Sequence, residues 1–198
     1  RNQDFHGALV PDGRALSYKG ITLALADGIS TSDVSGVASE TIVKSLLTDY
    51  YSTPDAWTVK TSASRVISAT NSWLHAQSRF SGVTDVDHGH VCTLAAIIIK
   101  ARTAHLFHAG DSRIWRLSGH SLEPLTQDHH VSLGGGETVL SRAIGAAAHV
   151  EIDYKAEAIA QGDVFLLTTD GVHDHWSPKR VARHIETAVD LDVAAQAI

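Results

Sequence analysis

Phe165-Leu-Leu-Thr-Thr-Asp-Gly-Val-His-Asp174 is an apolar run that ends abruptly in two carboxylates, with a glycine between them. The apolar half has the length and residue types of a buried β-strand. A strand with an aspartate at its tip holds that side chain at the edge of a sheet, where carboxylate oxygens can bind a cation. We therefore expect Asp170 to be a candidate metal ligand, with Asp174 shortly after it in the chain.

Two further apolar strands end in the same way, at Asp27-Gly28 and at Gly110-Asp111. An Asp-Gly pair after a strand is also ordinary turn chemistry, so each case on its own favours a turn. Three such ends are harder to explain as turns, because strand ends on one edge of a sandwich bring carboxylates close together. Carboxylates in close contact cannot all stay ionised unless a cation lies among them.

The expected ligand set consists of oxygen atoms. Asp4 is a further candidate, and the glycine after Asp27 lets the backbone carbonyl of Gly28 turn toward an ion. Oxygen ligands favour the hard ions Mg²⁺ and Mn²⁺ over zinc.

The composition is that of one globular domain with a sizeable core: 198 residues, 43% hydrophobic and 19% charged. A net charge of -6 favours a cation site and disfavours nucleic-acid or membrane partners. No apolar run approaches the roughly 18 residues of a membrane span, and no signal peptide is recognisable. The single cysteine allows no internal disulfide, which suits a cytoplasmic location. Because the chain begins with Arg and has no Met, we expect residues 1–198 to be one domain trimmed at both ends.

The hydrophobic periodicity predicts an α+β fold with antiparallel sheets covered by helices. Helices are expected at 34–51, 57–80 and 140–144, with a last one capped by Ser177-Pro178. A turn is expected at 11–14 and a mobile loop at 128–137. Strands are expected at 4–10, 17–26, 92–99, 104–109, 114–117, 122–125 and 150–154, and in the run that begins at Phe165.

Six motifs follow one another along nearly the whole chain. They are Asn2-Gln-Asp4, Ala26-Asp-Gly28, Ala109-Gly-Asp-Ser-Arg113, Leu125-Thr-Gln-Asp-His129, Leu140-Ser-Arg-Ala-Ile-Gly145 and the stretch from Gly162 to Gly171. In this order and spacing they resemble the metal-dependent PPM family, the type 2C protein serine/threonine phosphatases, in its bacterial form.

The resemblance implies an α-β-β-α sandwich of two antiparallel sheets flanked by helix pairs, with a binuclear Mg²⁺ or Mn²⁺ centre at one edge. Asp27, the carbonyl of Gly28 and Asp170 would hold the two core ions. Asp4 would act directly or through water. Asp111 and Asp174 would join Asp170 in a weaker third site. The expected partner is a phosphorylated protein, a cognate serine/threonine kinase or one of its targets.

Two ions about 3.5–4 Å apart can activate a bridging water and clamp a phosphoryl group, so no covalent phosphoenzyme is required. The absence of other motifs agrees with this mechanism. A cysteine phosphatase needs an arginine six residues after its cysteine, but Ile98 stands six after Cys92. Nucleophile-elbow, phosphate-loop and zincin motifs are absent from the sequence. Cys92 is expected to fill the core.

Three departures from the family pattern leave a second function open. Ile29 stands where some members place a general acid, so leaving-group protonation would fall to water at the metal or to another residue. The family's phosphate-binding arginine would lie before Arg1, and Arg1 itself stands two residues too late in the chain to replace it well. The last core ligand, in a Gly-x-x-Asp-Asn motif, would follow Ile198. The alternative is a pseudophosphatase or phosphoprotein-binding module of a larger signalling protein.

The histidine pairs also allow more than one interpretation. His88/His90, His129-His130 and His173/His175 have the spacing of metal ligands, but no third zinc-type ligand is evident, which favours surface or loop positions. His173 and His175 flank Asp174 and could support it. The glycines at 134–136 either shape access to the site or form a flexible loop.

Overall fold

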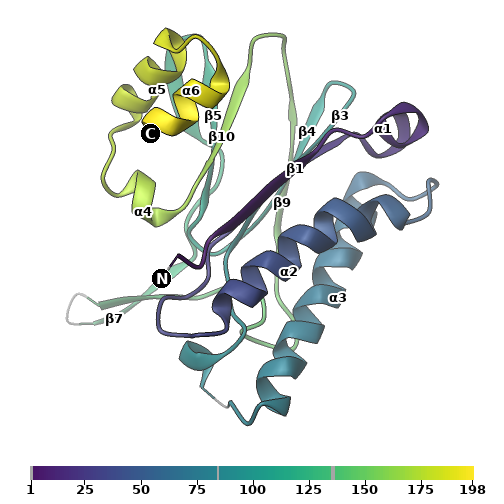
Figure 1. Ribbon diagram of the computed structural model, residues 1–198, viewed down its shortest axis with the longest axis vertical. Coiled ribbons are helices and arrows are strands. Elements are labelled where there is room, and N and C mark those ends of the chain that lie inside the picture. The colour runs from purple at the N-terminus through teal and green to yellow at the C-terminus, as the bar shows by residue number, and fades with distance from the viewer. Residues whose placement is uncertain (1, 84, 135–136) are drawn as a thin grey trace.

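The computed structural model describes residues 2–83, 85–134 and 137–198 (Figure 1). In these ranges the strands form three antiparallel sheets, with the orders β1-β2-β3-β4-β9, β10-β5-β6 and β7-β8. The strands are Phe5–Leu9 (β1), Ile21–Ala26 (β2), Leu94–Lys100 (β3), Thr103–Ala109 (β4), Arg113–Ser118 (β5), Ser121–Pro124 (β6), His130–Gly134 (β7), Glu137–Leu140 (β8), Asp153–Ala158 (β9) and Val164–Thr168 (β10).

Six described helices surround the two larger sheets, and a pair of them covers the outer face of each sheet (Figure 1). They are Gly13–Lys19 (α1), Ser35–Thr48 (α2), Val59–Phe80 (α3), Asp170–His173 (α4), Pro178–Thr187 (α5) and Leu191–Ala197 (α6), with short 3₁₀ turns at Asp49–Ser52 and Val86–His88. None of the described helices is long and apolar enough to cross a bilayer.

The helix pair α2 and α3 packs on one face of the five-stranded sheet. Apolar side chains at helical spacing, such as Ile42 and Leu46 of α2, are fully buried against Ala96 and Ile98 of β3 in one core cluster. Thr58 caps α3 by accepting a hydrogen bond from the Thr61 amide, which fixes where the helix begins.

The opposite face of this sheet packs against the three-stranded sheet. Ala95 and Ile97 of β3 lie in a second cluster with Ile114 of β5, and Phe165 of β10 packs against it. Since β3 is buried on both faces, its sequence is apolar without alternation. On the outer face of the smaller sheet, β5 and β6 pack against α5. The order helices, sheet, sheet, helices confirms the predicted α-β-β-α sandwich.

The turn predicted at 11–14 and the strand start predicted at Ser17 are wrong, because α1 occupies Gly13–Lys19. A tertiary contact decides the local structure here. Lys19 is buried, and its ammonium group donates to Thr53 Oγ1 at 2.7 Å and to the Pro54 carbonyl at 3.1 Å. Gly20, with φ of 80°, then turns the chain into β2.

The loop predicted at 128–137 is largely the β7–β8 hairpin, and 135–136 lie outside the described residues. The short helix predicted at 140–144 is also wrong. Leu140 ends β8, and Ile144 exchanges two backbone hydrogen bonds with Cys92, at 2.8 and 3.1 Å. These partners satisfy the backbone of the segment that leads into β3, which short-range periodicity could not reveal.

Candidate metal centre

The end of β2 places Asp27 at the edge of the sandwich with its backbone held on both sides. The Asp27 amide donates to Thr93 Oγ1 at 2.9 Å, and the Asp27 carbonyl accepts from the Thr93 amide at 2.8 Å. At Gly28 a Cβ atom would lie within 2.8 Å of Ser35, so only glycine fits this close approach. The chain therefore turns away from β2 with Asp27 fixed at the edge.

Asp4 and Asp170 arrive at the same edge from different elements. Asp4 directly precedes β1, whose first residue, Phe5, pairs with Ala26 of β2, so Asp4 lies beside Asp27. Strand β10 ends at Thr168, and Asp170 is the first residue of α4. Its Oδ1 accepts a hydrogen bond from the Gly171 amide at 2.7 Å. Asp170 thus lies just past the strand tip rather than on it.

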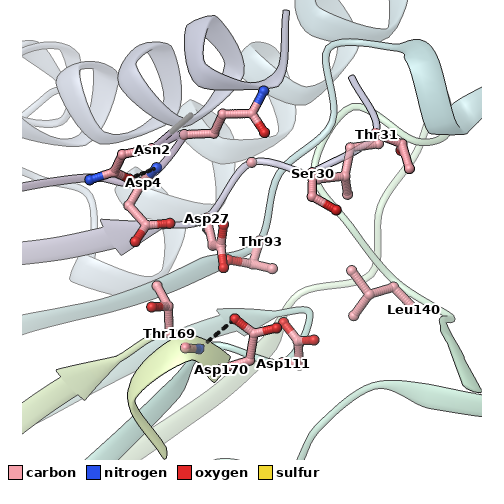
Figure 2. Close-up of a pocket in the computed structure, with 14 residues that line it drawn as sticks. Asn2, Asp4, Asp27, Ser30, Thr31, Thr93, Asp111, Leu140, Thr169 and Asp170 are labelled. Carbon is pink, nitrogen blue, oxygen red and sulfur yellow. Dashed lines mark hydrogen bonds between the residues drawn. The ribbon is translucent and has the colours of Figure 1, made fainter. Parts of the chain in front are cut away.

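These carboxylates face one pocket of about 420 Å³. Figure 2 shows Asp4, Asp27, Asp111 and Asp170 around it, together with Thr93 and Thr169. Gly28 and Ile29 also line it. The described lining residues include no lysine, arginine or histidine, so the lining itself offers no side-chain cation to Asp4, Asp27 and Asp170.

The electrostatic consequence appears at Asp27. Burial, together with the adjacent carboxyl groups of Asp4 and Asp170, raises the pKa of Asp27 to about 8. Without a cation the cluster therefore retains a proton near neutral pH. A divalent ion could take the place of that proton, and the available donors are carboxylate, hydroxyl and carbonyl oxygens. Such a set fits Mg²⁺ or Mn²⁺.

Asp111 and Asp174 occupy different positions relative to this pocket. Asp111 lines it, and its Oδ2 lies 3.1 Å from His130 Nε2. Asp174 follows α4 and is not among the lining residues. The hydrogen bond from Arg113 to Asp128 raises the pKa of Arg113, and the charges of Asp174 and Asp111 raise it further. The structure thus brings five of the six sequence-predicted ligands together and leaves Asp174 beside Arg113.

Sequence reasoning did not identify the hydrogen-bond partners of Arg113 and His129. Arg113 donates to both oxygens of Asp128, at 2.9 and 2.6 Å, which fixes the start of β5 against the segment between β6 and β7. His129 lies in the loop between β6 and β7, as one of the predicted alternatives had it, but its side chain is only 10% exposed and hydrogen-bonded, so it is not a surface residue. Both residues lay within recognised motifs, but their partners are distant in sequence.

The sandwich and its all-oxygen edge pocket define a class of domain in which a metal site lies between two sheets. The chain belongs to the protein phosphatase 2C family, whose sequence model matches residues 1–193. It is 29% identical over 171 residues to the serine/threonine phosphatase stp of Listeria monocytogenes. That match covers 75% of this chain and 65% of the relative, so the chain spans just under two thirds of that protein.

Solved structures share the fold. The serine/threonine phosphatase of S. agalactiae superposes with a TM-score of 0.80 at 22% identity, covering 100% of this chain and 85% of that one. The catalytic domain of the serine/threonine protein phosphatase PstP, solved in complex with two manganese ions, gives a TM-score of 0.77 at 22% identity. That match covers 99% of this chain and 83% of the other.

Proposed function

We propose that this domain hydrolyses phosphoserine and phosphothreonine in proteins, using water activated by two Mn²⁺ or Mg²⁺ ions in the carboxylate pocket. The observation that carries the proposal is the grouping of Asp4, Asp27 and Asp170 around one pocket without a side-chain cation. Family membership and the manganese ions of the PstP domain support it. The choice of serine and threonine follows the names of the relatives.

In this proposal each group of the chain has a definite task. Asp27, Asp170 and the Gly28 carbonyl would hold the two core ions, and Asp4 would contribute directly or through water. Asp111 and Asp170 would hold a third ion more weakly, and Asp174, which does not line the pocket, would have to turn toward them to join that site. Thr93 orients Asp27 through its backbone and hydroxyl contacts. The ions, when bound, supply Lewis acidity and lower the pKa of water.

The substrate enters from the open side of the pocket. Ser30 and Thr31 line its rim next to Ile29, and Leu140 at the end of β8 lines the other side. The hydroxyl groups can donate hydrogen bonds to phosphoryl oxygens, while Ile29 has no proton to give to the leaving group. We propose that the phosphoprotein substrate is a cognate serine/threonine kinase or one of its targets. The lone buried Cys92 suits a reducing, cytoplasmic compartment.

A second candidate is a domain that binds a phosphoprotein without turning it over. Ile29 favours it, because an apolar residue lines the pocket at the position that some family members use for a general acid. Such a domain would recognise the phosphoryl group through its bound ions and release no phosphate. It would serve as a regulatory module of a signalling protein.

Phosphate release from a phosphothreonine peptide, with Mn²⁺ and with EDTA, tests the first proposal. We expect release that requires Mn²⁺, that is lost in Asp170→Asn and that persists in Asp12→Asn. Asp12 is a suitable control because it is exposed and its side chain caps no helix. A phosphotyrosine peptide should be a poor substrate.

The same peptide separates the two candidates. Mn²⁺-dependent retention of the peptide without phosphate release would support the binding module. If the peptide is neither hydrolysed nor retained, both proposals are contradicted.

A further inference from the structure

Two consecutive histidines hold the two consecutive residues that follow β4. The His129 amide donates to the Gly110 carbonyl at 2.9 Å, and the Gly110 amide donates back to His129 Nδ1 at 3.1 Å. His130 Nε2 lies 3.1 Å from Asp111 Oδ2. His129 therefore hydrogen-bonds the backbone of Gly110, and His130 contacts the carboxylate of Asp111, which lines the pocket.

The contacts of His129 determine its tautomer. Because Nδ1 accepts the Gly110 N–H, a neutral ring carries its proton on Nε2. Nε2 faces Asp153 Oδ2 at 3.1 Å, and the other Asp153 oxygen accepts from Arg142 at 2.8 Å. The ring is thus oriented at both nitrogens, by the backbone of Gly110 on one side and by Asp153 on the other.

This tautomer argues against a second metal site at the same place. His108, His129 and Asp153 each bring one potential ligand atom within 4.8 Å of the others. However, the Nδ1 lone pair of His129 accepts the Gly110 N–H, and Nε2 is protonated. The ring has no free lone pair for an ion. His108, whose ring centroid lies 4.8 Å from that of His129, packs against the ring as a buried neighbour.

The turn itself needs a fixed geometry. Gly110 has φ of 106°, a region that favours glycine, and a Cβ atom there would lie within 2.7 Å of Thr93. Thr93 is the residue that holds the backbone of Asp27. A displacement of Gly110 would move Asp111 directly and would loosen the packing behind Asp27.

We propose that Asp153 and His129 form a positioning pair that fixes the Gly110 peptide and thereby orients Asp111 in the carboxylate pocket. This inference rests on the proposed function for its catalytic consequence. Asp153 sets the ring through Nε2, and the ring sets the peptide through Nδ1. Neither residue lines the pocket, so both act through Gly110 and Asp111. Side chains that support metal ligands in this way typically change metal affinity by about 10–100-fold when replaced.

Two substitutions of His129 separate its two contacts. In His129→Asn the side-chain oxygen lies close to the position of Nδ1 and can accept the Gly110 N–H, but the side chain cannot reach Asp153. In His129→Gln the terminal amide lies close to Nε2 and can donate to Asp153, but nothing replaces the Nδ1 acceptor. His120→Gln is the matched control, because that side chain is 93% exposed and its one partner among the described residues is Glu186.

Two measurements read the result. The first is hydrogen exchange at the Gly110 amide in metal-free protein. The second is the Mn²⁺ concentration that gives half-maximal phosphate release. In His129→Gln we expect loss of Gly110 protection and an increase of about 10-fold in that concentration. We expect His129→Asn to retain most of the protection with a smaller increase, and His120→Gln to match the wild type.

The proposal is overturned if His129→Gln keeps the Gly110 protection, or if both His129 variants lose it equally. A thermal melt identifies a variant that has simply lost its fold, and Asp153→Ala then provides a second route to the same displacement. The exchange measurement needs no turnover. A wild-type protein that protects Gly110 but releases no phosphate would sink the proposed function and leave the positioning pair standing. An active wild type with a rapidly exchanging Gly110 amide would contradict the positioning pair and leave the proposed function standing.

Discussion

Asp27 and Asp128 are both partly buried aspartates near the same edge of the sandwich, yet their surroundings shift the carboxyl pKa in opposite directions. Asp27 has the carboxyl groups of Asp4 and Asp170 as neighbours, and its pKa is raised to about 8. At Asp128 burial alone would raise the pKa, but the hydrogen bonds and charge of Arg113 lower it. The first environment needs a cation from solution, whereas the second already contains one. Burial alone therefore does not distinguish a metal site from a structural ion pair. The sign of the neighbouring charge does.

The largest expected effect comes from neutralising the carboxylate that lacks a cation. Asp27→Asn should reduce Mn²⁺-dependent phosphate release by about 100-fold or more, since a bound ion supplies several kcal/mol to the transition state. In EDTA the same variant should melt at or above the wild-type temperature, because it removes a destabilising like-charge contact. A variant that lost activity and metal-free stability together would show that Asp27 is structural.

Breaking the ion pair should have the opposite signature. Asp128→Ala leaves Arg113 without its partner, and the two side chains are only 27% and 19% exposed. We expect a loss of about 2 kcal/mol in the free energy of unfolding, measured by urea denaturation. The control is Asp55→Ala, because the Arg14–Asp55 pair is 76% and 37% exposed. That substitution should cost less than about 0.5 kcal/mol. Equal losses in the two variants would contradict the comparison.

A further expected effect is a pH dependence of the stability of the metal-free protein. Because the folded-state pKa of Asp27, about 8, lies above its unfolded value of about 3.9, the folded protein binds more protons between those values. Unfolding then releases a proton, and stability should fall as the pH rises from about 4 to about 8. The urea midpoint in EDTA, measured for the wild type relative to Asp27→Asn, isolates this contribution.

His108 acts in the other direction and must be subtracted. Burial lowers its pKa to about 4, so its contribution to stability is lost as the pH falls below about 6.5. Since His108 is present in both proteins, its contribution cancels in the difference. A difference that does not change between pH 5 and pH 8 would contradict the raised pKa of Asp27.

The sequence predicted the position of a side chain correctly where that position depends only on the end of one strand. Asp27, Asp111 and Asp170 each follow an apolar strand and a glycine lies next to each, so their arrival at one edge could be predicted from the fold class. Strand β3 could also be predicted, because burial on both faces makes its sequence continuously apolar.

Features that depend on contacts between distant segments could not be predicted. The Asp128 carboxylate is hydrogen-bonded by Arg113, 15 residues away. The orientation of the His129 ring depends on its hydrogen bond from the Gly110 amide, 19 residues away. Helix α1 forms where the Pro11–Arg14 signals indicated a turn, and Lys19 at its end is buried against the segment at Thr53. In each case a partner that is remote in the sequence determines the local structure.

Titration of metal-free protein with Mn²⁺, with the free ion followed by electron paramagnetic resonance, tests most directly the claim that the unpaired carboxylates form an ion site. Wild type and Asp12→Asn should bind Mn²⁺ saturably, with two ions per chain, while Asp27→Asn should lose this binding. The account is contradicted if the wild type binds no Mn²⁺ saturably, or if Asp27→Asn binds it as the wild type does.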